Sequence, residues 1–319
     1  MKATILIPNY NNASFLIECL TSIKEQTYTD FNILIIDDAS TDNSVNIITE
    51  FDDFRITLIK KSKNSGIIDS LNIGLEAIDS EYIIRMDGDD IMHKDRVKKL
   101  ISFMDKNEDI GVCGSGIQHF GISNDTIIYE QSPIQNHTNL IFGHSVGHAS
   151  VILRTTIIKN NNITYSKGYT YIEDYKLFYD LSQVTKMTSI PDILYYYRRE
   201  EYNNFKHEDI KKIGYKKIYS EILSKLEFKN LGKSSEIHYQ LYHNTKITLP
   251  IKSLIAHLKL IKKQNLNLKL YDSELVFDIL KQIKSKLFYR LADQNKTTFL
   301  SLLKYQYISL DKLYYHFRK

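Results

Sequence analysis

The sequence predicts an α/β protein, in which a mostly parallel central sheet with helices on both faces is followed by a helical region. Two observations predict this fold. Between residues 3 and 90, short apolar runs alternate with segments of helical periodicity, which is the pattern of a parallel sheet covered on both faces. Beyond about residue 203, the strand-like runs stop and Lys, Leu, Ile and Tyr recur at helical spacing. We therefore expect a first domain over residues 1–202 and a second region over 203–319.

The first domain begins with buried strands that alternate with helices. Runs of β-branched and aliphatic residues predict strands at 3–7, 32–36, 55–59 and 82–86. Apolar residues at helical spacing predict helices at 13–26, about 41–51 and 67–78, and Ser40 or Thr41 is a candidate cap for the second of them. Right-handed crossovers then place the carboxyl ends of these strands at one edge of the sheet.

The pattern is looser after residue 90. Helices are predicted at 94–107 and 173–184, and strands at 110–117, 127–129, 149–153 and 193–198. In the C-terminal region, Pro250 is the one strong breaker, and the predicted helices are 207–226, 236–247, 251–263, 273–291 and 297–316.

Composition is that of an ordinary globular protein, with 43% hydrophobic and 25% charged residues. The net charge of +4 is unevenly distributed, because residues 1–199 hold 19 Lys/Arg and 26 Asp/Glu (−7), whereas residues 200–319 hold 23 and 12 (+11). Cys19 and Cys113 lie among apolar neighbours, which favours buried thiols over a disulfide. No signal-peptide pattern or uncharged stretch of membrane-spanning length is visible, so we expect a cytoplasmic location.

Polar motifs follow each of the first strands at the point where the strand is expected to end. They are Pro8-Asn9-Tyr10-Asn11-Asn12, Asp37-Asp38-Ala39-Ser40-Thr41-Asp42, Asn64-Ser65-Gly66 and Asp87-Gly88-Asp89-Asp90. Each motif alone is also what an ordinary βα turn contains. Ligands in open α/β sheets bind at the carboxyl ends of strands, so the convergence of all of them at one edge indicates a binding site.

The acidic cluster Asp87 to Asp90 supports two interpretations from its residues alone. Carboxylates packed this closely repel one another, and hard divalent cations prefer carboxylate oxygens and share sites with phosphates. A solvated acidic turn explains the same residues. The pair Glu173-Asp174, at the start of a predicted helix, is equally open: first-turn acids are favoured by the helix dipole, and a carboxylate there could also act as a base.

Taken in order, these motifs resemble family 2 of the glycosyltransferases, which are inverting nucleotide-sugar transferases with the Rossmann-like GT-A fold. The resemblance covers residues 3 to about 200, and within the family the chain looks most like bacterial enzymes that build lipopolysaccharide, capsule or related surface glycans. It implies transfer of a hexose or N-acetylhexosamine from a UDP-sugar to a glycan or lipid-linked acceptor, with Mn²⁺ or Mg²⁺ as cofactor. The carriers are Ile7 to Asn11, Ile35 to Asp42, Asn64-Ser65-Gly66, Asp87 to Asp90 and Glu173-Asp174.

The resemblance implies a role for each site residue on the donor side. Asp89 is the implied direct metal ligand, and Asp87 serves the ribose or the metal. Asp38 accepts from the imide N–H of uracil, a role that suits an acceptor-only carboxylate. Asp90 and Arg198 are assigned to the diphosphate or sugar, with Arg199 as the alternative to Arg198. The remaining implied nucleotide contacts are Pro8, Tyr10, Asn11, Asn64 and Gly66.

On the acceptor side the resemblance implies that Asp174 is the general base, with Glu173 beside it. An inverting transfer needs one base, which takes the proton of the acceptor hydroxyl as that oxygen attacks the anomeric carbon. His148 is read as a sugar or diphosphate contact and His144 as structural. The chain also departs from the family. Ser70 and Leu71 stand where many members have an arginine, Ala39 replaces a frequent glycine, and the Gln-x-x-Arg-Trp motif of processive members is absent, because the chain has no Trp.

Two questions stay open at this stage. The basic region 203–319 fits either association with an anionic membrane, peripheral at the inner face of the cell membrane, or a solvated charged surface, including an oligomer contact. It shows no nucleic-acid-binding signature. The rival functions are an inactive scaffold of the same fold and another nucleotide-dependent α/β enzyme. A dinucleotide-dependent oxidoreductase is disfavoured, because no Gly-x-Gly-x-x-Gly follows the first strand.

Overall fold

The structure is a computed structural model that describes residues 1–144, 146–200 and 207–294, without the side chains of 292–294. The chain divides into two compact units, Met1–Gly214 and Tyr215–Lys319. This division falls inside helix α8 (Glu208–Lys225), C-terminal of the boundary predicted at residue 202. The predicted helix at 297–316 lies outside the described residues.

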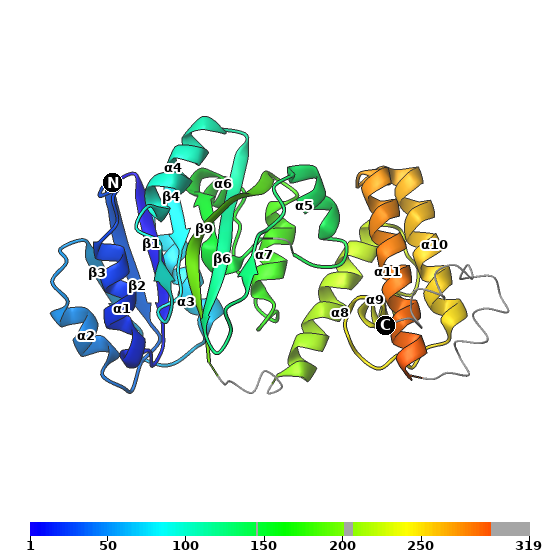
Figure 1. Ribbon diagram of the computed structural model, residues 1–319, viewed down its shortest axis with the longest axis horizontal. Coiled ribbons are helices and arrows are strands. Elements are labelled where there is room, and N and C mark those ends of the chain that lie inside the picture. The colour runs from blue at the N-terminus through cyan, green and yellow to red at the C-terminus, as the bar shows by residue number, and fades with distance from the viewer. Residues whose placement is uncertain (145, 201–206, 295–319) are drawn as a thin grey trace. The chain divides into compact units, whose positions relative to one another are not determined.

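The first unit is built on a mixed sheet in the order β3-β2-β1-β4-β8-β6-β9-β5, with β7 paired to β6 (Figure 1). Strands β1 to β4 are parallel, as predicted, and the strands of the second half are joined by both parallel and antiparallel pairs. The strands are β1 Ala3–Asn9, β2 Phe31–Asp37, β3 Ile56–Lys60, β4 Tyr82–Arg85, β5 Ile91–Met92, β6 Ile110–Gly121, β7 Thr126–Ile127, β8 Ile152–Arg154 and β9 Lys186–Arg199.

Helices cover both faces of this sheet, which confirms the predicted fold class. Alternate residues of β1 point to opposite faces. Ile5 joins a core cluster with residues of α1 and α4, whereas Leu6 packs against Gly74 of α3 on the other face. The helices of this unit are α1 Ala13–Lys24, α2 Ser44–Glu50, α3 Ile67–Ala77, α4 Arg96–Lys106, α5 Pro133–Asn139, α6 Thr155–Asn160 and α7 Glu173–Leu181, with a 3-10 turn at His148–Ser150.

Strand β9 is longer than the sequence predicted. The prediction placed a strand at 193–198, just after Pro191 and Asp192 in the sequence. In the structure the strand begins at Lys186, and its pairing with β6 passes from Ile190 to Ile193 at an irregularity. Proline is tolerated in a sheet at such bulges because no ladder hydrogen bond is required of it there. The strand therefore continues through Pro191 and carries its last residues to the acidic cluster.

The strand predicted at 149–153 is also displaced. Its first residues form the 3-10 turn His148–Ser150, and β8 starts only at Ile152. Ser150 Oγ bonds back to the carbonyl of Gly147 inside this turn. That local bond competes with the extended conformation, which explains why apolar residues here do not all join the sheet.

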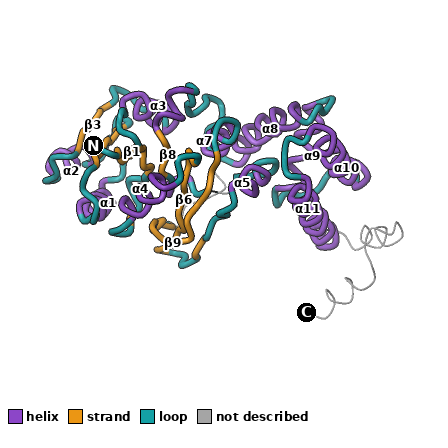
Figure 2. The backbone as a smooth tube through the Cα atoms, turned by 90° about the horizontal axis from the view of Figure 1, so that it is seen from above, coloured by secondary structure: helices purple, strands orange, loops and turns teal. Residues whose placement is uncertain are grey.

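The second unit is helical. Within it lie the C-terminal part of α8, then α9 Leu231–Tyr242, α10 Ile251–Leu268 and α11 Ser273–Gln294 (Figure 2). Helix α9 starts earlier than predicted because the side chain of Asn230 accepts from Lys233 N and caps it. Pro250 is the N-cap of α10, at the break that the sequence indicated. Among the described residues, no helix is long and apolar enough to cross a membrane.

Candidate active site

A pocket of about 350 Å³ lies at the carboxyl ends of the parallel strands. Three of the predicted strand-end motifs supply most of its lining, and the fourth contributes Asp38. This matches the expectation that parallel strands bring their ends to one edge. Asn11 is not in the lining. Its side chain accepts from Thr41 N at 2.8 Å and so ties two of the loops together. The lining residues are Pro8, Asn9, Tyr10, Asn12, Asp38, Asn64, Gly66, Ile67, Ser70, Asp87, Gly88 and Asp89.

The two acids after β2 have separate surroundings. Asp37 is buried, accepts from Asn9 Nδ2 at 2.8 Å, and also bonds Ser40. It therefore holds the first two loops in place. Asp38 faces the pocket, and its oxygens accept from the backbone N–H groups of Ser65 and Gly66 at 2.9 and 2.8 Å.

Lys61 is a functional candidate that the sequence reasoning missed. It follows β3, is almost fully buried, and its ammonium lies 2.6 Å from Asp38 Oδ1 and 2.9 Å from Asp69 Oδ2. It also donates to Ser70, which occupies one of the positions where the family often has arginine. Lys61 thus brings a positive charge to this side of the pocket, although it stands at a different position of the sequence from that arginine. In the sequence Lys61 is only a lysine at the end of a predicted strand, a feature too common to indicate a functional residue.

The acidic cluster places its three carboxylates differently. Asp87 and Asp89 line the pocket, and Asp87 is ion-paired with the buried Arg85 of β4. Asp90 is 1% exposed, and its carboxylate accepts from Tyr195 Oη at 2.6 Å and from Arg198 N at 2.7 Å. Asp90 thus joins the cluster to β9 and orients the loop, whereas the other two face the pocket.

The charges of this cluster make a divalent cation a good fit. Burial and the neighbouring charge of Asp87 raise the pKa of Asp89, so the cluster would gain from a positive partner. Within the part of the chain that the structure describes, no three His, Cys, Asp or Glu side chains are grouped as a metal site. Mg²⁺ sites that use one or two carboxylates are completed by substrate phosphates and water. Asp89 and Asp87 are therefore suited to be the protein ligands of such a site, with phosphate and water as the other ligands.

Arg198 lies beside this cluster at the end of β9. Its Nε donates to the carbonyl of Asp89 at 2.8 Å, and its guanidinium is ion-paired with Glu18. The guanidinium also lies 4.6 Å from the ring centroid of Phe15 and 4.4 Å from that of Phe120. These contacts hold Arg198 against the backbone of the acidic loop.

A second group of side chains surrounds the start of α7. Asp174 is partly exposed, and its Oδ1 accepts from Tyr175 N at 2.7 Å. His144 Nε2 lies 3.5 Å from Asp174 Oδ2. Glu173 is 9% exposed, and burial together with the charge of Asp174 raises its pKa to about 7. Of the two predicted acids, Asp174 is thus the one with solvent access.

The two histidines of the loop before β8 occupy different environments. His148 Nε2 is 2.8 Å from Tyr165 Oη, and burial lowers the pKa of its imidazole well below the usual value. His144, which the sequence reasoning assigned to structure, is instead the histidine beside Asp174. Both rings pack against Phe178 of α7. Spacing could not show which of them also approaches Asp174, because that depends on how the loop packs.

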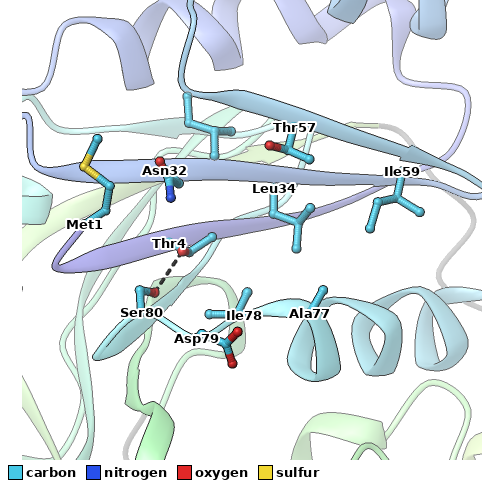
Figure 3. Close-up of a pocket in the computed structure, with 11 residues that line it drawn as sticks. Met1, Thr4, Asn32, Leu34, Thr57, Ile59, Ala77, Ile78, Asp79 and Ser80 are labelled. Atoms are coloured by element: carbon cyan, nitrogen blue, oxygen red, sulfur yellow. Dashed lines mark hydrogen bonds between the residues drawn. The ribbon is translucent and has the colours of Figure 1, made fainter.

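A larger pocket, of about 460 Å³, lies elsewhere on the first unit (Figure 3). Its lining comes from the starts and middles of β1 to β3 and from the turn after α3, where Thr4 bonds Ser80. Asp79 is the one side-chain carboxylate among its lining residues. The strand-end motifs contribute nothing to it, so size alone does not identify the active site.

Comparisons with known proteins identify relatives of this chain. An uncharacterized glycosyltransferase of Haemophilus influenzae is 28% identical over 271 residues, which are 79% of this chain and 84% of the relative. Glycosyltransferase GlyG of Streptococcus pneumoniae is 27% identical over 286 residues, covering 81% of this chain and 95% of GlyG.

The crystal structure of Staphylococcus aureus TarS residues 1–349 in complex with UDP-GlcNAc superposes with a TM-score of 0.66 at 16% identity. The superposition covers 93% of this chain and 92% of that one, and it supports the GT-A fold. The family model for glycosyl transferase family 2 matches residues 4–193, more than half of the chain. The protein therefore belongs to family 2 of the glycosyltransferases and is a transferase of glycosyl groups.

Proposed function

We propose that this glycosyltransferase moves a hexose or N-acetylhexosamine from a UDP-sugar to an acceptor hydroxyl, with inversion and with Mn²⁺ or Mg²⁺ as cofactor. The observation that carries the proposal is the gathering of Asp38, Asp87 and Asp89 on one strand-end pocket. The structural neighbour TarS, which was crystallised with UDP-GlcNAc and with UDP, supports uracil as the base.

The donor half of the site has groups suited to both the base and the diphosphate of the nucleotide. Uracil presents one N–H between two carbonyls, and Asp38 is the acceptor-only group on its side of the pocket. Asp89, with Asp87, would hold the divalent cation, whose charge offsets the negative charge that develops on the leaving diphosphate. Arg198 keeps the acidic loop in position, because its backbone N–H donates to the carboxylate of Asp90 and its Nε donates to the carbonyl of Asp89.

The acceptor half is centred on Asp174. Its carboxylate takes the proton of the acceptor hydroxyl while that oxygen bonds to the anomeric carbon and the bond from that carbon to the diphosphate oxygen breaks. The backbone N–H of Tyr175 holds one oxygen of Asp174, and His144 faces the other. Glu173 is buried beside it, and we assign it a supporting role.

The proposed acceptor is a lipid-linked or free glycan of the bacterial surface. The relatives include a teichoic acid poly(glycerol phosphate) polymerase of Staphylococcus epidermidis, 25% identical over 298 residues, of which this chain covers 41%. They also include TarS, a poly(ribitol-phosphate) β-N-acetylglucosaminyltransferase, of which the chain covers 35%. We extend this to cell-surface glycans as a class, with teichoic acid, capsule and lipopolysaccharide as the members to be tested.

The test is a panel of UDP-, GDP- and TDP-sugars with and without Mn²⁺, read by thermal shift and by nucleoside diphosphate release. UDP-sugars should raise the unfolding midpoint in the presence of Mn²⁺, and Asp89→Ala should remove most of that metal-dependent rise. Asp79→Ala is the matched control, since it deletes an exposed carboxylate at the larger pocket. If no nucleotide sugar shifts the midpoint under either condition, the proposal is wrong.

A further inference from the structure

The outer face of α10 has a composition unlike that of the other helices. The helix carries four lysines and no acidic residue. All four, Lys252, Lys259, Lys262 and Lys263, are exposed. At 100° per residue they fall within an arc of about 100°. The opposite side of α10, with Leu254, Leu258 and Ile261, is buried in the second unit.

Large apolar side chains are exposed on and beside this arc. Leu260 and Leu266 are 38% and 52% exposed. In the helical projection Leu266 lies between the lysines, and Leu260 lies about 60° beyond Lys263. Phe277 of α11, 47% exposed, adjoins the edge of this face, because Lys262 Nζ lies 4.3 Å from the centre of its ring. Helices α10 and α11 pack against each other. Single exposed apolar residues are ordinary, but a set of them in and around the lysines of a helix that carries no acid calls for a partner.

We propose that this basic-apolar face, formed by Lys259, Leu260, Lys262, Lys263, Leu266 and Phe277, docks on the surface of an anionic lipid bilayer. The lysines complement lipid phosphates. The leucines and the phenylalanine gain free energy only from a partner that offers an apolar interior, which a polyphosphate chain or a nucleic acid does not. Long lysine stems let the ammonium groups stay at the headgroups while the apolar side chains enter the acyl boundary.

The geometry favours a helix that lies on the bilayer. Helix α10 is not long and apolar enough to cross a membrane, and its buried face is occupied by the core of the second unit. A lysine-rich face with exposed leucines in it and beside it is typical of an interfacial helix. Glu274 and Asp278 are exposed on α11 near Phe277, so the electrostatic attraction comes from α10.

The biological sense of this inference rests on the proposed function, because a lipid-linked acceptor is presented at such a surface. Its test needs neither donor nor transfer. Failure to bind vesicles would therefore leave the transferase proposal intact, and failure of every nucleotide sugar would leave the docking face intact.

The first experiment is co-sedimentation of the full chain with vesicles of pure phosphatidylcholine or with added phosphatidylglycerol. Binding should require the anionic lipid and weaken as salt rises. Lys259→Glu with Lys263→Glu should lower the partition coefficient on the order of 25-fold, at about fivefold for each lysine removed. Lys229→Glu with Lys233→Glu makes the same change of net charge at exposed residues around the start of α9 and should leave the partition coefficient within about twofold.

The second experiment separates a bilayer from a soluble polyanion. Leu260→Asn with Leu266→Asn should lower vesicle binding at least about tenfold, and it should leave binding to long-chain polyphosphate unchanged. The proposal is overturned if the control pair loses as much vesicle binding as the α10 pair. It is also overturned if the leucine pair binds vesicles like the original protein, which would point to a polyanionic partner. An unchanged unfolding midpoint in each variant shows that the fold is intact.

Discussion

Asp37 and Asp38 are neighbours in the chain, yet their carboxylates have different partners. Asp37 bonds Asn9 and Ser40 inside the protein, and Asp38 faces the pocket with Lys61 at its side. The same contrast holds between the buried Asp90 and the pocket-lining Asp89. At the scale of single residues, therefore, the orientation of each carboxylate separates those that hold the loops in place from those that line the pocket.

Asp174→Asn should keep the donor-induced thermal shift while lowering kcat by about two to four orders of magnitude, because the amide cannot accept the acceptor proton. The matched control is Asp180→Asn on the same helix, which removes a carboxylate paired to Lys176 and should leave kcat nearly unchanged. Undiminished transfer by the Asp174 variant would mean that another group is the base.

His144→Ala should lower kcat by about tenfold with little change in the KM for the donor, since a group facing the base is lost. His144→Gln retains an N–H donor and should recover part of the activity. Steady-state kinetics of both variants distinguish positioning from folding. An equal loss in both variants, or a change in donor KM alone, contradicts a role for His144 at Asp174.

Glu173 predicts a pH dependence of stability. Its pKa is raised from 4.5 to about 7, so the folded state holds this proton more tightly than the unfolded state does. The resulting stabilisation is complete below pH 4.5 and is lost as the pH rises to 7, with a total of up to about 3 kcal/mol. Glu173→Gln should flatten this part of the curve of unfolding midpoint against pH. A variant curve parallel to that of the original protein would contradict the assignment.

At the scale of elements, close packing of α3 on β1 positions the edge that carries the pocket. Gly74 lets the helix approach the strand, because a Cβ at this residue would lie 2.2 Å from Leu6 Cδ1. Strand β1 ends at Asn9, opposite Asp37, and the loop before α3 supplies Gly66 to the pocket. A shift of α3 would therefore move the loop that supplies Gly66 to the pocket.

Gly74→Ala should destabilise the protein by about 1–3 kcal/mol, because the new methyl group overpacks this contact. Gly232→Ala in α9 is the control, since its Cβ would meet no atom within 4 Å. That change should be neutral or stabilise by up to about 1 kcal/mol through helix propensity. Denaturant unfolding of both variants measures the difference, and equal effects would show that the Leu6 contact is not limiting.

At the scale of the whole molecule, the two units divide the charge and the chemistry. Every lining residue of the strand-end pocket, and Asp174, belongs to Met1–Gly214, whereas the basic-apolar face belongs to the helical unit. The charge asymmetry of the sequence follows this division. The acidic half holds the carboxylates of the site, and the basic half presents lysines.

Hydrogen exchange of the full chain should report this division. UDP with Mn²⁺ is expected to slow exchange at residues 8–12, 38–42, 64–66 and 87–90 while α9 and α10 exchange at unchanged rates, because exchange protection follows local contacts. Anionic vesicles without nucleotide should instead slow exchange in α10. Protection of α10 by the nucleotide alone would contradict the assignment of donor binding to the first unit.

Much of this protein was predictable from the sequence because its fold is built from local patterns. Apolar runs and helical spacing located β1 to β4 and the helices between them, and parallel topology then required their polar ends to meet. The buried, unpaired thiols of Cys19 and Cys113 were also predicted correctly. The motifs at these strand ends, with Glu173 and Asp174, were sufficient to identify the family.

Only the tertiary structure decided which side chains face one another. Strand β9 continues through Pro191, which interrupts the local apolar pattern. Two other contacts join residues that are far apart in the chain: Lys61 pairs with Asp38, and His144 approaches Asp174. Such contacts depend on how loops and strands pack, and periodicity carries no information about packing partners. The sequence by itself thus determined the fold class, the family and the edge that holds the site, whereas the three-dimensional arrangement assigned each carboxylate and histidine its neighbour.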